Sequence, residues 1–319
     1  MRSACLMLAI FTFLSSHFSL PPFDFSPAVR QDQPVFKSES ELVVLQVSVR
    51  DRSGRYVAGL ARDAFTVIDD GKPQTIAMFS AAEVPASVGF LIDNSNSMRP
   101  NRERVIVSAV ELVKHSHQKD EILVLTFNED VRLAWGPSIA GETDPGTFAS
   151  AMAKAIIARG MTAIDDAIVA GLKRVAHGSH SRQVLVVVSD GDDNASKASR
   201  DEVLKQVHES DATIYTIALI DPLTREGNPK LLRGLARATG GESYQPRRAE
   251  DISEAFDEIA RDIRSAYTLA YAPTAATAGT SADGERRRTV RVYVRSNDGR
   301  ALRVRTRDGY FEKVRGGPR

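Results

Sequence analysis

Cysteine is almost absent from this sequence, which has one, Cys5, in 319 residues. A single cysteine forms no disulfide within the chain, so a protein with this composition depends on its core for stability. The sequence also lacks common catalytic signatures, because no G-x-S-x-G elbow, no H-E-x-x-H helix and no P-loop occurs in it. These absences argue against the hydrolases and nucleotide-binding enzymes that such motifs mark.

An excess of charge of one sign is also missing. The 42 Lys and Arg residues nearly balance the 41 Asp and Glu residues, which leaves a formal net charge of +1. This balance argues against a nucleic-acid binder, which would need a basic face. A short basic run, 286–288, and three arginines at alternate positions, Arg303, Arg305 and Arg307, remain. Arginines spaced by two beside apolar neighbours predict one solvated face of a sheet rather than a phosphate site.

One apolar segment near the N-terminus predicts export. Arg2 is followed by the apolar run 4–14 and then by a polar Ser-Ser-His stretch, which is the order of a signal peptide. The run is too short to span a bilayer as a mature helix. We assign residues 1–30 to a signal peptide with no clear cleavage motif, and expect the mature protein in the periplasm or outside the cell. An uncleaved signal anchor is the alternative. Cys5 lies at the start of this run, before its apolar core, where a lipid-attachment cysteine would not be.

The middle of the chain predicts an α/β domain. With 42% hydrophobic residues, the chain is long enough for about two domains. Between residues 84 and 265, helix and strand signals alternate, which is typical of a doubly wound, mostly parallel sheet. Strands are predicted at 87–92, 122–127, 131–133, 184–188 and 213–219, and helices at 102–115, 148–158, 164–175, 202–209, 231–238 and 251–264.

Both ends of the mature chain predict β-structure. Residues 35–83 and 266–312 contain alternating apolar segments separated by turn residues, including Asn297-Asp298-Gly299 as a hairpin signal. Neither set can bury a face alone, so we expect one shared β-sandwich-like domain with the α/β domain inserted between its halves. Two separate small sheets are the alternative. The Ala-, Thr- and Gly-rich link 274–284 is expected to be a mobile loop.

The pattern Asp93-Asn94-Ser95-Asn96-Ser97 is the most informative feature of the chain. It follows the apolar run 87–92, so it begins where a buried strand ends. Alternate residues of an extended segment point the same way, so the Asp93 carboxylate and the Ser95 and Ser97 hydroxyls can converge. Three hard oxygens with one formal charge suit Mg²⁺, which binds through few protein groups and keeps open positions.

Two further oxygen-bearing residues follow at matching places downstream. Thr162, in Gly160-Met161-Thr162, lies just before the predicted helix 164–175. Asp190 ends the β-branched run 183–188, at the carboxyl end of a second central strand. Open α/β sheets bind their ligands at this edge. The rest of the metal site can therefore be looked for at these two residues.

This order of motifs resembles the von Willebrand factor A domain and its metal-ion-dependent adhesion site. By that resemblance, Asp93, Ser95, Ser97 and Thr162 would hold the cation directly or through water, and Asp190 would act through water. The segments around Asp51-Arg52-Ser53-Gly54 and Asp69-Asp70-Gly71-Lys72-Pro73, and the closing 304–310, resemble an exported bacterial subfamily best known from acidobacteria.

The resemblance implies a protein-binding module for adhesion or interaction, and not an enzyme. The cation would be Mg²⁺, or Mn²⁺, with Ca²⁺ possible, and it would coordinate an Asp or Glu carboxylate of a protein partner. The alternatives are a structural scaffold that never loads metal and a metal-assisted hydrolase, which would need a positioned base. The histidine pairs at 115 and 117 and at 177 and 180 are predicted on the surface, away from Asp93. Trp135 is predicted to pack on the core rather than to contact a partner.

Overall fold

The computed structural model describes residues 42–220, 227–248, 250–274, 285–296, 299 and 301–313. The signal peptide predicted at 1–30, nearly all of the link expected at 274–284, and Asn297-Asp298 of the predicted hairpin lie outside these residues. Residues Ser40–Arg319 form one compact unit, to which the description below applies.

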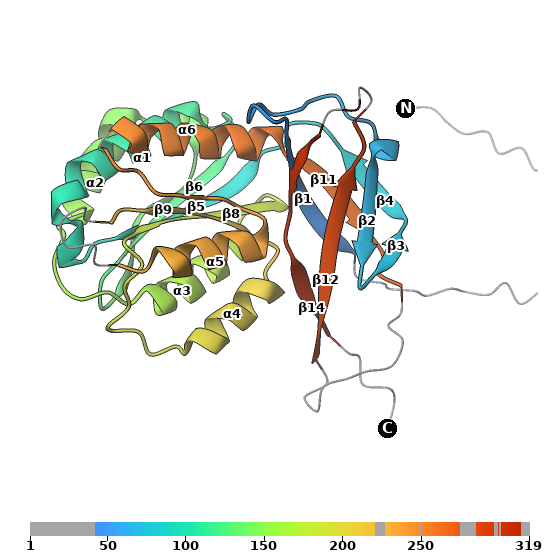
Figure 1. The fold of residues 1–319 in the computed structure, drawn as a ribbon. Coiled ribbons are helices and arrows are strands. Elements are labelled where there is room, and N and C mark those ends of the chain that lie inside the picture. The colour runs from blue at the N-terminus through green and yellow to red at the C-terminus, as the bar shows by residue number, and fades with distance from the viewer. Residues whose placement is uncertain are drawn as a thin grey trace, which may run out of the picture. The chain divides into compact units, whose positions relative to one another are not determined.

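A six-stranded sheet forms the centre of the α/β part (Figure 1). Its strand order is β10-β9-β8-β5-β6-β7, and its neighbours are parallel except for β7, which runs antiparallel to β6. Every residue of β5 is buried, as expected of a central strand covered on both faces. The strands are β5 Ala86–Asp93, β6 Glu121–Phe127, β7 Val131–Ile139, β8 Arg182–Ser189, β9 Thr213–Ala218 and β10 Ser243–Tyr244.

Helices cover both faces of this sheet (Figure 1). Phe90 and Ile92 of β5 belong to the core under α1, α2 and α6, whereas Leu91 belongs to the core under α3, α4 and α5. This division follows from the alternation of side chains along a strand. The helices are α1 Arg102–His115, α2 Pro145–Ala155, α3 Ile164–Ala176, α4 Arg200–Glu209, α5 Pro229–Thr239 and α6 Glu250–Ser265, with short 3₁₀ helices η1 Arg62–Ala64, η2 Asn96–Asn101 and η3 Ala140–Glu142.

The two ends of the chain build two antiparallel sheets together. Their strand orders are β13-β1-β11-β4 and β14-β12-β2-β3, so each sheet contains strands from both ends. The buried apolar residues of the two sheets form one cluster, in which Leu45 and Val67 join Leu269 and Val290. The shared arrangement is confirmed, and two separate terminal sheets are excluded. The strands are β1 Val43–Arg50, β2 Phe65–Asp69, β3 Lys72–Gln74, β4 Ile76–Ser80, β11 Tyr267–Tyr271, β12 Glu285–Val294, β13 Arg303–Arg305 and β14 Gly309–Lys313.

A buried ion pair joins the strands from the two ends. Asp69 and Arg288 are 0% and 1% exposed, and the Arg288 Nε lies 2.9 Å from the Asp69 Oδ1. The hydroxyls of Tyr271 and Tyr310 donate to the other Asp69 oxygen, at 3.0 and 2.9 Å. The basic run 286–288 therefore contains one fully buried member, because its partners arrive from distant parts of the sequence.

Of the alternating arginines, Arg303 is exposed as predicted, but Arg305 and Arg307 do not share a solvated face with it. Arg307 is 7% exposed and donates to the carbonyls of His208 and Ser210 at the end of α4. Arg305 donates to the Gly240 carbonyl after α5 and pairs with Asp262 of α6. Carbonyls at a helix C-terminus have no partner within the helix and attract cations. These two arginines therefore fasten the antiparallel sheets to the α/β part.

Two predicted elements differ in extent from those observed. The strand expected at 131–133 continues to Ile139, and Trp135 within it packs edge-on against Phe148, with ring centroids 5.3 Å apart. The helix expected at 148–158 is α2, which is displaced toward the N-terminus. Asp144 accepts from the Thr147 amide and starts this helix with Pro145 in its first turn. It ends at Ala155 because the amides of residues 157 and 158 donate to the Asn94 side chain instead.

The buried ion pair provides a stability test. Asp69→Ala removes the closest carboxylate from the buried Arg288 guanidinium and leaves it the Glu312 carboxylate, a carbonyl and the more distant Asp70 carboxylate at 3.9 Å. Removing one partner of a buried pair typically costs about 3–5 kcal/mol, so we expect a loss of that size in the free energy of unfolding by denaturant. As the control, Asp308→Ala removes the exposed partner of Arg287 and should cost less than about 1 kcal/mol. Equal effects of the two substitutions would contradict the role given to Asp69.

Candidate metal centre

The candidate site lies where β5 and β8 end side by side. These strands are parallel neighbours, with Ile92 opposite Val188. The next residue of each strand, Asp93 and Ser189, therefore lies at the same edge of the sheet. The chain leaves β5 for α1 on one face of the sheet, and α3 leads into β8 from the other face. Such a reversal of winding opens a crevice at the carboxyl ends of the strands.

Asp93 is the buried centre of this crevice. Its side chain is 0% exposed. One carboxylate oxygen accepts the Ser95 amide at 2.9 Å, and the other accepts the Ser189 hydroxyl at 2.6 Å. The Ser189 hydroxyl also accepts the Gly191 amide at 2.9 Å. The carboxylate is thus held in one orientation from both strands.

The spacing of the two serine hydroxyls is compatible with a small octahedral cation. The Oγ atoms of Ser95 and Ser97 lie 3.0 Å apart and share a hydrogen bond. Adjacent oxygen ligands of an octahedral Mg²⁺, each at about 2.1 Å from the ion, lie about 3 Å apart. Ser95 is 2% exposed and Ser97 is exposed, so the pair extends from the buried carboxylate toward solvent.

Thr162 is brought to this turn by backbone hydrogen bonds. The Arg159 amide donates to the Asn94 carbonyl at 2.7 Å, and the Asn96 amide donates to the Gly160 carbonyl at 3.2 Å. Thr162 is 3% exposed, and its hydroxyl forms no hydrogen bond to the described residues. A nearly buried hydroxyl with its oxygen unused is available to a ligand.

Asp190 completes the set of predicted residues. It is 5% exposed and accepts the Asp192 amide at 3.1 Å. Burial raises the pKa of the Asp93 carboxyl to about 6, the hydrogen bonds from Ser189 and Ser95 oppose this rise, and the charge of Asp190 adds to it. No Lys or Arg of the described segments forms an ion pair with either carboxylate. A cation bound among these oxygens would compensate their charge, so the donor set fits the predicted metal.

Sequence reasoning missed three residues that hold the site together. Ser189 orients Asp93, although its only signal was its place beside Asp190. Asn94 bridges three loops: its amide donates to the Phe127 carbonyl, and its side chain binds the backbone of residues 155, 157 and 158. Asn194 accepts the Thr162 amide at 2.8 Å. Only the polar character of these turns could have indicated such roles.

The histidines considered as catalytic groups lie elsewhere. His117 precedes β6, and His177 and His180 precede β8, which places them at the amino-terminal edge of the sheet. His115 ends α1 and pairs with Asp257. Within the part of the chain that the structure describes, no three His, Cys, Asp or Glu side chains gather as a metal site. The candidate centre instead combines carboxylates with hydroxyls.

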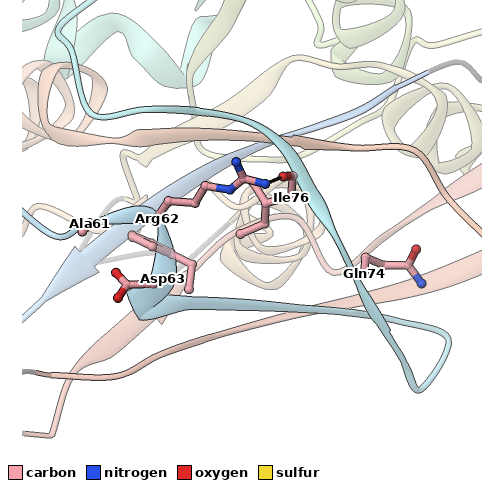
Figure 2. Close-up of a pocket in the computed structure, with 6 residues that line it drawn as sticks. Ala61, Arg62, Asp63, Gln74 and Ile76 are labelled. Atoms are coloured by element: carbon pink, nitrogen blue, oxygen red, sulfur yellow. Dashed lines mark hydrogen bonds between the residues drawn. The ribbon is translucent and has the colours of Figure 1, made fainter.

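A separate depression of about 480 Å³ lies on the antiparallel sheets, away from this centre (Figure 2). The Arg62 guanidinium extends across it and donates to the Ile76 carbonyl, while the Asp63 carboxylate points away. Its other lining residues are Ala61, Phe65, Gln74 and Ile76. Asp63 is the one carboxylate among these lining residues and it points away from the depression, so this depression indicates no chemistry.

The comparison with protein families decides the identity of the α/β part. The family model of the von Willebrand factor type A domain matches residues 87–258, more than half of the sequence. The chain belongs to the von Willebrand factor type A domain family. The match includes both strands and all the loops that form the centre. No curated protein matches the chain.

Solved structures show distant likenesses to this type A domain protein. A von Willebrand factor type A protein from Catenulispora acidiphila is 14% identical, with 84% of this chain and 73% of that chain covered and a TM-score of 0.48. BatB from Bacteroides thetaiotaomicron is 16% identical, with 55% and 99% covered and a TM-score of 0.41. Proximal thread matrix protein 1 from the mussel byssus is 16% identical, with 60% and 49% covered and a TM-score of 0.47. This chain thus spans about half of the mussel protein.

Metal binding at the centre can be measured by calorimetric titration of the protein with Mg²⁺ and Mn²⁺. We expect saturable binding that Asp93→Asn weakens at least about 100-fold, because even outer partners of metal ligands are worth 10–100-fold in affinity. The Asn side chain keeps the size of the Asp and can accept one of its two hydrogen bonds. Asp130→Asn, in an exposed loop and paired with Arg132, serves as the control and should bind like the wild type. Equal binding by wild type and Asp93→Asn would contradict the assignment.

Proposed function

We propose that this protein is a metal-dependent protein-binding module. Its Asp93, Ser95, Ser97, Thr162 and Asp190 would hold a divalent cation that coordinates an Asp or Glu carboxylate of the partner. The observation that carries the proposal is the 3.0 Å spacing of the two serine hydroxyls above a fully buried carboxylate. Domains of this family mediate protein–protein interactions, which supports the same reading.

The chemistry of the donors favours Mg²⁺, with Mn²⁺ or Ca²⁺ as substitutes. All the proposed ligands are hard oxygens, and hydroxyls outnumber carboxylates. A cation held mainly by neutral oxygens keeps most of its charge and attracts a negatively charged oxygen from outside. Asp93 fixes the buried side of the site, and the exposed Ser97 marks the side that faces a partner.

A binding function fits this geometry better than a hydrolytic one. Hydrolysis would need a base placed to activate water. The histidines at 117, 177 and 180 lie at the opposite edge of the sheet, and His115 lies at the end of α1. A metal-free scaffold would be expected to have lost a ligand, whereas all five positions carry an oxygen donor. We therefore place adhesion or interaction first among the three functions.

We also propose that the protein is exported to the periplasm or beyond the cell, as a member of the bacterial subfamily named above. The proposal rests on the signal-like residues 1–30 and on the turn motifs of the N-terminal strands. Among the described residues, no helix is long and apolar enough to cross a membrane.

The proposed function predicts the outcome of a peptide selection. A random dodecapeptide library is displayed to the immobilised mature protein in Mg²⁺, and bound peptides are eluted with EDTA. We expect the eluted pool to share an Asp or Glu that cannot be replaced by Asn or Gln, and we expect no such pool from Asp93→Asn. Enrichment of peptides without an acidic residue, or equal pools from both proteins, would contradict a carboxylate-binding metal site.

A further inference from the structure

Beside the candidate centre, the segment after α2 presents a row of exposed side chains. Ile157 and Met161 are 45% and 51% exposed, and Arg159 between them is exposed as well. The alternating residues Ala158 and Thr162 are buried. Exposed and buried residues therefore alternate along this segment, with Ala158 and Thr162 toward the protein and Ile157, Arg159 and Met161 toward solvent.

We propose that Ile157, Arg159 and Met161 form a platform that binds the partner next to its metal-bound carboxylate. The partner would be an extended peptide segment in which apolar and further acidic residues flank the acidic residue at the metal. This inference rests on the proposed function and specifies its partner.

The platform adjoins the metal ligands through the backbone. Met161 directly precedes Thr162, and the Gly160 carbonyl accepts the Asn96 amide from the turn that carries Ser95 and Ser97. A peptide whose carboxylate reaches the centre can therefore contact these exposed side chains.

The platform is also held rigidly. The Asn94 side chain accepts the amides of Ile157 and Ala158 at 2.8 and 2.6 Å, and the Glu129 carboxylate accepts the Met161 amide at 2.8 Å. Ala158 is 0% exposed and has φ +52°, a left-handed conformation that a non-glycine residue adopts rarely and at a cost. A surface fixed in advance loses little conformational entropy when a partner binds.

Charge indicates which end of the platform meets acidic residues. Arg159 is exposed and forms no ion pair with the described residues. Arg99, also exposed, contacts only the Ala158 carbonyl and the Asn96 side chain, at 3.4 and 3.5 Å. Glu129 places a negative charge beside Gly160 and Met161, whereas Arg99 lies at the other end, beside Ala158. An acidic neighbour in the partner is therefore favoured beside Arg99 and Arg159, and apolar ones over Ile157 and Met161.

The peptide selection above also tests the platform when it is repeated with Ile157→Ser/Met161→Ser. We expect apolar residues to be enriched within two positions of the shared acidic residue in the wild-type pool only. The dominant wild-type peptide should bind the double variant about tenfold more weakly, since each partly buried apolar contact is worth a few-fold in affinity. Mg²⁺ affinity and elution by EDTA should stay as in the wild type.

The charged part of the platform has a matched test. With Arg99→Gln/Arg159→Gln, a second acidic residue should disappear from the selected peptides while the shared one remains. Pools with the same flanking residues in wild type and both variants would overturn the platform and leave the proposed function intact. A pool that lacks the shared acidic residue in every protein would instead overturn the proposed function, and the platform with it.

Discussion

The candidate centre depends on the parallel pairing of β5 with β8. This pairing sets Ile92 opposite Val188, so the residues that follow the two strands meet at one edge. The Ser189 hydroxyl then reaches the Asp93 carboxylate at 2.6 Å. Without this register, a carboxylate that is 0% exposed would have no fixed orientation and no hydroxyl from the second strand. Every other feature of the centre is arranged around this buried carboxylate.

A second constraint lies between the α/β part and the antiparallel sheets. Asp262 of α6 is 1% exposed and accepts hydrogen bonds from Ser48 of β1 and Tyr215 of β9, in addition to its pair with Arg305 of β13. Arg182 donates to the carbonyls of Ile263 and Ala266 at the end of the same helix. A buried charge that loses its partner is costly, so each of these groups requires its partner in place. They fix where the antiparallel sheets meet the α/β part.

Local patterns in the sequence predicted much of the fold and the residues proposed for the metal. Asp93, Ser95 and Ser97 follow an apolar strand directly, so their convergence needs only the geometry of one turn. The shared arrangement of the terminal strands followed from the inability of either set to bury a face alone. The role of Asp93, Ser95 and Ser97 as metal ligands remains a prediction.

Contacts between distant residues could not be predicted in the same way. Arg288 is buried because Asp69, 219 residues earlier, is its partner. The prediction of a solvated face for the alternating arginines was wrong for Arg305 and Arg307. These two side chains bind helix ends and carboxylates that are distant in sequence. The end of α2 depends on Asn94, 63 residues before Ile157. In each case, tertiary partners outweighed the local pattern.

The central claim is that a divalent cation lies among Asp93, Ser95, Ser97, Thr162 and Asp190. The most direct measurement is anomalous scattering from crystals of the mature protein grown with Mn²⁺. We predict one strong peak within coordination distance of the Ser95 and Ser97 hydroxyls and in direct contact with Asp93 or one water away. A fully occupied Mn²⁺ peak elsewhere, with only water beside the Ser95 and Ser97 hydroxyls, would contradict the account.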